Sequence, residues 1–225
     1  MNATTVTQNL LQLNRARFVN AFLVREPDGF TLIDTTFPRG ADALIEAAQR
    51  AGGSIRRIAL THGHTDHAGS VDQLRQRLGH AVQVLMPELD ARILAREDGD
   101  KPNVPGGWPK LQTAPDDRLV AGDRVGSLEV VASPGHSPGH VAFLDTRDRT
   151  LIAGDAFITV GRVTVSSQPY WRFPFAAPAT WNKKKTVESA RALRTLDAPI
   201  LVVGHGPPVR VPGPAMDAAI ARAGG

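Results

Sequence analysis

Short apolar runs rich in β-branched residues alternate with helix-like patterns along both halves of this chain. Residues 17–24 and 30–34 flank the turn-forming triplet Pro27-Asp28-Gly29 and predict a pair of strands. Because strands and helices are mixed and the hairpins are short, the pattern predicts an α/β (α+β) fold with helices outside two sheets. Further strands are predicted at 55–60, 81–86, 128–133, 141–145, 150–155 and 199–206, and helices at 41–53, 68–79, 88–97, 181–196 and 214–223.

The length of 225 residues and the ordinary globular composition fit one large domain spanning residues 1–225. No apolar run approaches the roughly 18 to 20 residues that a membrane span needs, and the N-terminus lacks the pattern of a signal peptide. We therefore expect a cytoplasmic protein without membrane association. Two segments, 98–118 and 159–179, match neither strand nor helix, and loops of that length in a compact domain are usually functional.

The chain contains no cysteine, which excludes disulfides, thiolate nucleophiles and every metal site that needs a thiolate. Any metal ion must then be held by nitrogen and oxygen atoms. The formal charge is +4, but the arginines are scattered and Lys183-Lys184-Lys185 is the one tight basic run. Because a nucleic-acid-binding surface needs concentrated basic residues, we expect no nucleic-acid partner and at most a mild attraction for anionic substrates.

The stretch LTHGHTDHAGS, residues 60–70, crowds three histidines and an aspartate between a predicted strand and a predicted helix. On an extended segment His62 and His64 project to the same side and can hold one ion. Asp66 and His67 follow where the chain turns into the helix and can face a second ion. Taken singly, each residue fits a surface histidine or a helix cap. Taken together, they indicate a metal site.

Three further donors follow apolar, strand-like runs at a glycine or proline. They are His136 in SPGHSPGH, Asp155 in IAGDAF and His205 in VVGHGPP. Strand ends are where a sheet commonly presents its functional side chains. Together with the first group, five histidines and two aspartates suffice for two ions of four- or five-fold coordination, water included.

The succession H-x-H-x-D-H, then a PGH turn, GD and GH resembles the metallo-β-lactamase superfamily, with its glyoxalase II-like and lactonase-like hydrolases. The resemblance runs from the LIDT strand end at Asp34 to GHG at 204–206. It implies an αββα four-layer sandwich with a dinuclear metal site at one edge of the sheets. The implied ligands are His62, His64 and His136 for the first metal, Asp66, His67 and His205 for the second, and Asp155 as the bridge.

The resemblance also implies hydrolysis by a hydroxide that bridges two divalent ions, with zinc as the first choice and iron or manganese as alternatives. Zinc lowers the pKa of bound water from about 15.7 to about 7, so that hydroxide exists near neutrality. Asp66 is then the expected catalytic residue, because it holds the second metal and orients the hydroxide. A serine nucleophile is not indicated, since the sequence has no G-x-S-x-G motif.

The expected partner is a small-molecule substrate with an ester, thioester or lactone bond. Phosphodiester hydrolysis within the same superfamily and a non-catalytic metal-binding regulator are the alternatives. The helical extension with which glyoxalase II-like enzymes recognise glutathione is not apparent after His205. The tyrosine that the lactonases carry three positions after the bridging aspartate is replaced by Ile158.

Several residues have more than one interpretation. The segment 166–181 predicts either the wall of an apolar pocket or a core or homodimer contact. Its aromatic residues are Tyr170, Trp171, Phe173, Phe175 and Trp181. Trp108 belongs either to a second lid or to ordinary loop packing.

Three further polar residues have non-ligand roles in this interpretation. His140 orients the site, contacts the substrate or simply begins a strand. His80 lies far from the motifs in sequence and is expected at the surface. Asp34 either supports the ligand loops through hydrogen bonds or caps a turn.

Overall fold

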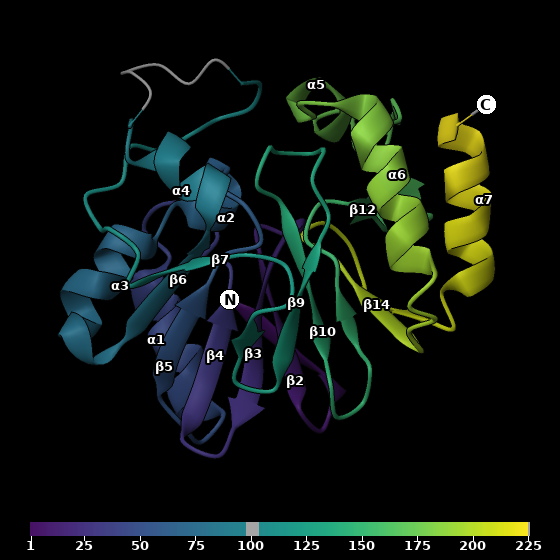
Figure 1. Ribbon diagram of the computed structural model, residues 1–225. Coiled ribbons are helices and arrows are strands. Elements are labelled where there is room, and N and C mark those ends of the chain that lie inside the picture. The colour runs from purple at the N-terminus through teal and green to yellow at the C-terminus, as the bar shows by residue number, and fades with distance from the viewer. Residues whose placement is uncertain (98–103, 225) are drawn as a thin grey trace. The chain divides into compact units, whose positions relative to one another are not determined.

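The computed structural model describes residues 1–97 and 104–224, and these divide into two compact units (Figure 1). The N-terminal unit contains residues 1–97 and 108–119, and the C-terminal unit contains residues 104–107 and 120–224. Each unit has a sheet and helices of its own. A single domain over residues 1–225 stays a prediction.

A seven-stranded sheet with the order β1-β2-β3-β4-β5-β6-β7 forms the N-terminal unit. Its first four strands pair antiparallel, and β4 to β7 pair parallel. The strands are β1 (Asn2–Thr7), β2 (Leu10–Arg15), β3 (Val19–Glu26), β4 (Gly29–Ile33), β5 (Ile55–Ala59), β6 (Gln83–Pro87) and β7 (Asp117–Leu119). The helices are α1 (Ala41–Arg50), α2 (Thr65–Ala68), α3 (Val71–Leu78) and α4 (Glu88–Leu94), with a 3₁₀ turn η1 at Gly79–Ala81.

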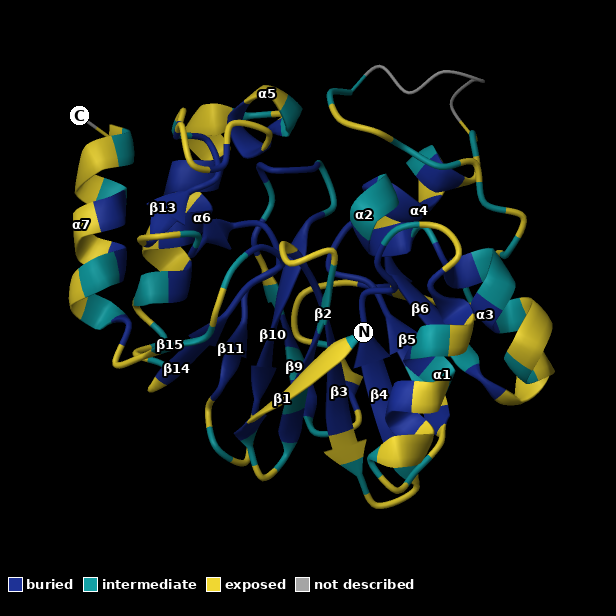
Figure 2. Cartoon of the chain, turned by 180° about the vertical axis from the view of Figure 1, so that it is seen from behind, coloured by how far each residue is buried: buried dark blue, intermediate teal, exposed yellow. Residues whose placement is uncertain are grey.

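Helices α1, α3 and α4 bury their apolar stripes against one face of this sheet. Leu44 of α1 and Leu74 of α3 are fully buried in one cluster with Leu23, Leu32 and Val84 of the strands. Burying a side chain of this size stabilises the fold by about 1.5 to 3 kcal/mol. The positions of α1 and α3 that are exposed (Figure 2) are polar, whereas α4 exposes Leu89 and buries Asp90. The apolar residues in the sequence therefore recur at helical spacing because they face the sheet.

The structure differs from the predicted elements of this unit at two places. The hairpin of β1 and β2 was not predicted, and β3 begins at Val19 because Ala16 and Arg17 form a turn with φ of 53° and 69°. The predicted helix 68–79 is two helices, α2 and α3, separated at Gly69. A Cβ at Gly69 would lie 2.5 Å from Pro38 Cδ, so the chain needs glycine where the two segments pack closely.

The C-terminal unit contains a six-stranded sheet with the order β15-β14-β11-β10-β9-β8 and a small β12-β13 hairpin. Strands β11 and β14 pair parallel and all other neighbours antiparallel. The strands are β8 (Arg124–Val125), β9 (Leu128–Ala132), β10 (Val141–Asp145), β11 (Leu151–Ile152), β12 (Phe157–Ile158), β13 (Thr164–Val165), β14 (Ile200–Val202) and β15 (Val209–Arg210). The helices are α5 (Ala176–Ala179), α6 (Lys183–Arg194) and α7 (Gly213–Gly224).

Helices α6 and α7 lie side by side in both views (Figures 1 and 2). Leu193 of α6 and Met216 of α7 are buried in one cluster with Leu144, Leu151 and Leu201 of the sheet. Helix α6 begins two residues later than predicted, at Lys183, because the Asn182 side chain caps it by accepting a hydrogen bond of 3.0 Å from the Lys185 N–H.

The two unassigned segments contain short elements. Segment 159–179 holds β13 and α5. Of segment 98–118, residues 98–103 lie outside the described residues, and its end enters β7. Among residues 1–97 and 104–224, no helix combines the length and the hydropathy needed to cross a membrane.

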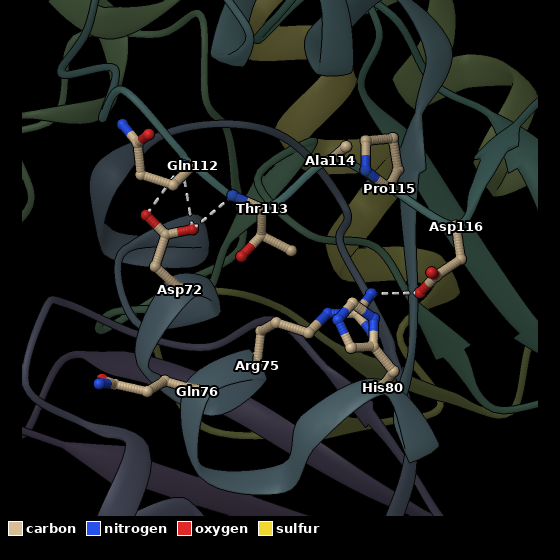
Figure 3. Close-up of a pocket in the computed structure, with 9 residues that line it drawn as sticks. All are labelled: Asp72, Arg75, Gln76, His80, Gln112, Thr113, Ala114, Pro115 and Asp116. Carbon is tan, nitrogen blue, oxygen red and sulfur yellow. Dashed lines mark hydrogen bonds and ion pairs between the residues drawn. The ribbon is translucent and has the colours of Figure 1, made fainter.

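The loop before β7 is attached to α3 (Figure 3). The Asp72 carboxylate accepts hydrogen bonds of 3.0 and 2.8 Å from the backbone N–H groups of Gln112 and Thr113. With the exposed His80 and other residues, these groups line a pocket of about 410 Å³. His80 is therefore at the surface, as the sequence predicts.

Asp116 closes the same pocket. Its carboxylate accepts hydrogen bonds from the Val84 N–H, at 2.7 Å, and from the Arg75 guanidinium. Partial burial raises the pKa of the Asp116 carboxyl, but these two donors outweigh burial, and the pKa lies below its ordinary value of 3.8. Asp116 therefore joins the loop to the sheet as a carboxylate.

Candidate metal centre

Four of the predicted donors follow β5 in the N-terminal unit. Because β4 and β5 are parallel and pair Ile33 with Ala59, their carboxyl ends meet at one edge of the sheet. Asp34 follows β4 at this edge, and Thr61 and His62 follow β5. The extended backbone of His64 then leads into α2, whose first turn carries Asp66 and His67.

Asp34 organises this edge with a fully buried carboxylate. Its Oδ1 accepts the Thr61 N–H at 2.8 Å, and its Oδ2 accepts the Thr61 hydroxyl at 2.8 Å. The same Oδ2 lies 2.8 Å from His67 Nδ1, so that nitrogen carries the proton and donates it. Nε2 is then the nitrogen of His67 that presents a lone pair.

The same reasoning fixes the tautomer of His62. The Thr61 hydroxyl has one hydrogen and donates it to Asp34, so the Thr61 oxygen accepts from His62 Nδ1, which lies 3.0 Å away. The His62 lone pair is therefore on Nε2. The interpretation of Asp34 as a support for the ligand loop agrees with these contacts.

The potential ligand atoms in this unit are close together. The ring centroid of His62 lies 4.8 Å from that of His64 and 4.1 Å from that of His67. His67 Nε2 lies 3.8 Å from an oxygen of Asp66. The imidazoles of His62 and His67 are fully buried, whereas about a quarter of the Asp66 side chain, 26%, is exposed. Asp66 is thus the donor of this group that water reaches.

Helix α4 and Trp108 support the segment between His62 and His64. The buried Asp90 of α4 accepts a hydrogen bond of 2.9 Å from the Gly63 N–H. The Trp108 ring lies edge-on to His64 with centroids 4.9 Å apart. A Cβ at Gly63 would approach the Trp108 ring to 2.5 Å, so only glycine fits beneath the indole. For Trp108, these contacts favour packing against the ligand segment.

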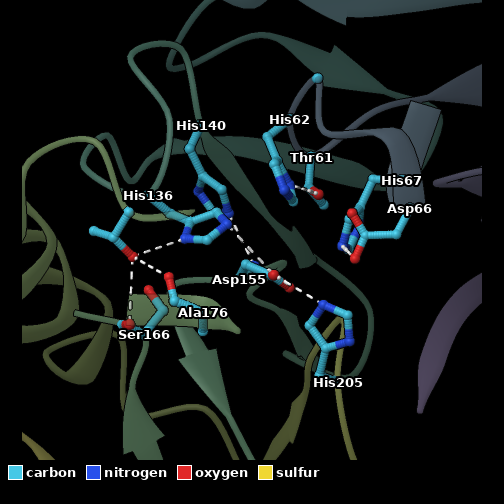
Figure 4. A network of polar contacts seen from close by, with 12 residues as sticks. Thr61, His62, Asp66, His67, His136, His140, Asp155, Ser166, Ala176 and His205 are labelled. Carbon is cyan, nitrogen blue, oxygen red and sulfur yellow. Dashed lines mark hydrogen bonds and ion pairs between the residues drawn. The ribbon is translucent and has the colours of Figure 1, made fainter. Parts of the chain in front are cut away.

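In the C-terminal unit, strand pairing brings Asp155 and His205 together. Strands β11 and β14 are parallel and pair Ile152 with Val202. Continuing that register past the ends of both strands places Asp155 beside His205. An Asp155 carboxylate oxygen, Oδ2, lies 3.0 Å from His205 Nε2 (Figure 4). Both side chains are buried.

His140 lies on the other side of Asp155. Its Nε2 accepts the backbone N–H of Asp155 at 2.9 Å, and its Nδ1 lies 2.8 Å from the Ser133 hydroxyl. With Nε2 accepting, Nδ1 carries the proton and donates to Ser133. Of the roles left open by the sequence, these contacts favour a group that orients Asp155.

His136 occupies the loop between β9 and β10. Its Nδ1 lies 3.0 Å from the Thr180 hydroxyl, which donates to the Ala176 carbonyl at 2.8 Å. Thr180 therefore accepts from His136 Nδ1, and the His136 lone pair is on Nε2. That nitrogen lies 3.5 Å from the Asp155 Oδ2 atom. A lone pair that faces a carboxylate is stabilised by a cation or a proton between the two.

The aromatic segment 166–181 reaches the same donors. The Phe173 ring lies 4.5 Å from the His205 ring, measured between centroids. Phe173 and Tyr170 are buried with Ile158, so part of the segment is core. Trp171 and Phe175 are 78% and 70% exposed. The segment therefore has one buried side against His205 and one solvent-exposed side.

The chemistry of the donors fits divalent metal ions. Buried imidazoles that present Nε2 lone pairs, next to carboxylate oxygens, form the nitrogen and oxygen set that zinc, iron and manganese accept. In the N-terminal unit, His67 lies between the other two members of such a set, with its ring 4.1 Å from that of His62 and its Nε2 3.8 Å from an Asp66 oxygen. His136 and His205 with Asp155 supply another in the C-terminal unit.

The supporting residues were mostly missed at the sequence level. Thr61, Ser133 and Thr180 each contact a histidine Nδ1, and Asp90 holds the backbone between two histidines. Thr61 and Ser133 adjoin motifs, which is the one signal that points to them. Thr180 lies 44 residues from His136 in sequence, and no local pattern identifies it.

Sequence comparison links the chain to a known family. The model of the metallo-beta-lactamase superfamily matches residues 14–205. The uncharacterized protein YobT of Bacillus subtilis (strain 168) is 43% identical over 211 residues, which cover 91% of this chain and 90% of YobT. The probable metallo-hydrolase YflN of the same strain is 28% identical over 209 residues, which cover 83% of this chain and 79% of YflN.

A hydroxyacylglutathione hydrolase of Rhodopseudomonas palustris (strain BisB5) is 26% identical over 146 residues, which cover 62% of this chain and 48% of that protein. Among solved structures, the DIM-1 metallo-beta-lactamase aligns over 99% of this chain and 96% of its own with a TM-score of 0.74 and 15% identity. At that identity the likeness concerns the fold alone. The predicted fold class is confirmed.

Proposed function

Because the chain belongs to the metallo-β-lactamase superfamily, we propose that it is a metal-dependent hydrolase that cleaves an ester, thioester or lactone bond of a small molecule. In this proposal the donors of both units hold two divalent ions, zinc or else iron or manganese. His62, His64 and His136 would hold the first ion and Asp66, His67 and His205 the second, and Asp155 would contribute to both.

One observation carries the proposal: the Nδ1 atoms of His62, His67 and His136 each lie against a fixed hydrogen-bond acceptor. That contact holds each imidazole in the tautomer whose Nε2 is a ligand. Metal-binding histidines usually have a partner of this kind on the second nitrogen. His140 is held in the same way, but its Nε2 accepts the backbone N–H of Asp155, which separates it from these three.

Divalent ions bound at these donors would lower the pKa of a water molecule and polarise the carbonyl group under attack. The chain's own residues position the reactants. Asp66, the partly exposed carboxylate, accepts a hydrogen bond from the attacking water and orients it toward the carbonyl carbon. The Phe173 ring beside His205 covers that ligand with an apolar surface and excludes bulk water from it.

One of the relatives supports a thioester as the substrate class. Hydroxyacylglutathione carries its acyl group on sulfur, so the relative of that name supports a thioester, although the match spans about half of that protein. The absence of cysteine makes this class easy to test, because a thiol-specific reagent reacts with the product thiol and not with the enzyme.

The test begins with the metal content of the purified protein, measured by mass spectrometry. Turnover is then measured on a panel of thioester, lactone, β-lactam and phosphodiester substrates. We expect two metal ions per chain and turnover of thioester or lactone. Replacement of His64 or Asp155 by alanine removes metal and turnover together, whereas the exposed His80→Ala leaves both unchanged.

Equal metal content and activity in all three variants would contradict the proposed site. Turnover of the phosphodiester alone would move the proposal to the nuclease branch of the superfamily. Metal binding without any turnover would favour a regulator. A cytoplasmic location and a homodimer stay predictions, which cell fractionation and light scattering would test.

A further inference from the structure

Two exposed arginines of the C-terminal unit each lie over an aromatic ring, Arg162 over the buried Tyr170 and Arg172 over the exposed Trp171. The guanidinium carbon of Arg162 lies 4.7 Å from the centre of the Tyr170 ring, and that of Arg172 lies 4.8 Å from the centre of the Trp171 ring. The two rings meet edge-on with centroids 6.5 Å apart. We call these four residues the Arg–aromatic surface.

The backbone fixes this arrangement next to the proposed site. The Phe173 N–H donates to the Tyr170 carbonyl at 3.0 Å, so residues 170–173 form a turn. The turn presents Trp171 and Arg172 outward while Phe173 packs on His205. Gly161, with φ of 75°, lies under the turn, where a Cβ would approach Arg172 Cδ to 2.9 Å.

Both guanidinium groups are available for an anion. Within residues 1–97 and 104–224, Arg162 and Arg172 have no carboxylate within ion-pair distance, and both are exposed. By contrast, Arg194 of the same unit is paired with Asp217 and Asp197. An aromatic face holds a guanidinium in place through cation–π attraction but leaves its N–H edge available to a carboxylate or phosphate.

We infer that the Arg–aromatic surface binds the anionic end of the substrate. This inference rests on the proposed function and specifies its substrate: an acyl compound with a carboxylate or phosphate on an apolar or aromatic body. The apolar body lies on Trp171, the anionic group is bound by Arg162 and Arg172, and the bond to be cleaved extends past Phe173 toward Asp155 and His205.

The surface fits this occupant better than it fits another macromolecule. A dimer contact built on Trp171 would bury two like charges per chain, which costs free energy unless the partner supplies carboxylates. Two cationic groups are also too few for a nucleic-acid surface, which needs a basic face. A small anion with an aromatic body pairs its charge with the guanidinium groups and stacks its ring on the exposed Trp171 indole.

The test measures binding directly and does not depend on turnover. Isothermal calorimetry compares 2-naphthalenesulfonate with its neutral analogue N,N-dimethyl-2-naphthalenesulfonamide. Both are chosen because they are poor metal ligands. The proteins are the wild type, Arg162→Gln, Arg172→Gln and the double variant. Arg124→Gln, on strand β8 of the same unit, is the matched control for loss of one positive charge.

We expect the wild type to bind the sulfonate about tenfold more tightly than the sulfonamide, because hydrogen bonds to a charged group are stronger than those to a neutral group but are weakened by exposure to water. Each single variant lowers that ratio about threefold, and the double variant brings it close to one. Arg124→Gln leaves this ratio unchanged, and the ratio does not depend on the metal content of the protein.

An equal ratio in all variants would overturn the inference. So would a loss in Arg124→Gln as large as in Arg172→Gln, because net charge would then explain the binding. Self-association of the wild type would also overturn the inference if it depends on protein concentration, persists in the presence of the probe and is abolished by Trp171→Ala. That result would assign the surface to a second copy of the chain. Failure of the hydrolysis panel alone refutes the proposed function and leaves the binding result standing.

Discussion

Replacement of Asp34 by asparagine provides a direct test of how the imidazoles are oriented. The Thr61 N–H requires an acceptor, so the asparagine oxygen takes the place of Asp34 Oδ1 and its NH₂ group takes the place of Oδ2. That NH₂ group donates where the carboxylate accepted. His67 Nδ1 must then accept, and the Thr61 hydroxyl is turned to donate to His62 Nδ1.

Both lone pairs thereby move from Nε2 to Nδ1, although the heavy atoms hardly change. Loss of one partner of this kind typically weakens metal binding 10- to 100-fold, or about 1.4 to 2.7 kcal/mol. Because Asp34→Asn affects His62 and His67 together, we expect the upper part of this range for total metal affinity. The unfolding free energy changes less, since each polar group keeps a hydrogen-bond partner.

The assay is competition with a chromophoric chelator, with ¹⁵N chemical shifts of the histidine rings as a second measurement. Asp28→Asn is the matched control, because Asp28 is an exposed carboxylate of the same unit that pairs with Arg57. Unchanged metal affinity in Asp34→Asn, or ring shifts that still place the protons on Nδ1, would refute the reasoning. A loss of the same size in Asp28→Asn would also refute it.

The remaining predictions concern neighbouring contacts. Gly63→Ala lowers the unfolding free energy by about 1 to 3 kcal/mol through its clash with the indole, and denaturation in urea should show a smaller cost in a Trp108→Ala background. Thr180→Val removes the acceptor for His136 Nδ1 and weakens metal binding about 10-fold or more, whereas Thr180→Ser retains it. Asp116→Asn destabilises by at most about 1 kcal/mol near neutral pH; because the folded-state pKa is lowered, the difference from wild type closes as pH falls below 3.8 in acid titrations of unfolding.

The sequence predicts the elements that end in donors because their signals are local. The runs that became β9, β11 and β14 are short, rich in apolar residues and closed by polar or glycine-rich turns, so burial and chain reversal coincide within a few residues. The N-terminal hairpin escaped prediction for a physical reason. Strand β1 is mostly exposed, and a strand at a sheet edge needs no alternation of apolar residues.

The contacts around the candidate metal-binding side chains depend on how neighbouring strands are aligned, and this alignment cannot be read from the sequence. His140 faces Asp155 because β9, β10 and β11 pair in one specific alignment, with Val141 opposite Ala132 and Phe143 opposite Ile152. A slip of one residue would turn His140 to the other face of the sheet. The motif therefore points to candidate donor residues, while the fold shows which atoms face each of them.

A single chemical device recurs around the histidines of both units. A hydroxyl group has one hydrogen to donate. When it donates that hydrogen to an acceptor, its oxygen must accept from the neighbouring imidazole, and this fixes the tautomer of the histidine. Thr61 does this between a carboxylate and His62, and Thr180 does it between a backbone carbonyl and His136. Ser133 accepts the same proton from His140, whose tautomer is therefore identical. What separates His140 from the proposed ligands is the group opposite its Nε2, a backbone N–H of Asp155. A tautomer alone therefore does not mark a metal ligand, and the chemistry facing the second nitrogen decides between binding an ion and positioning the residue that binds it.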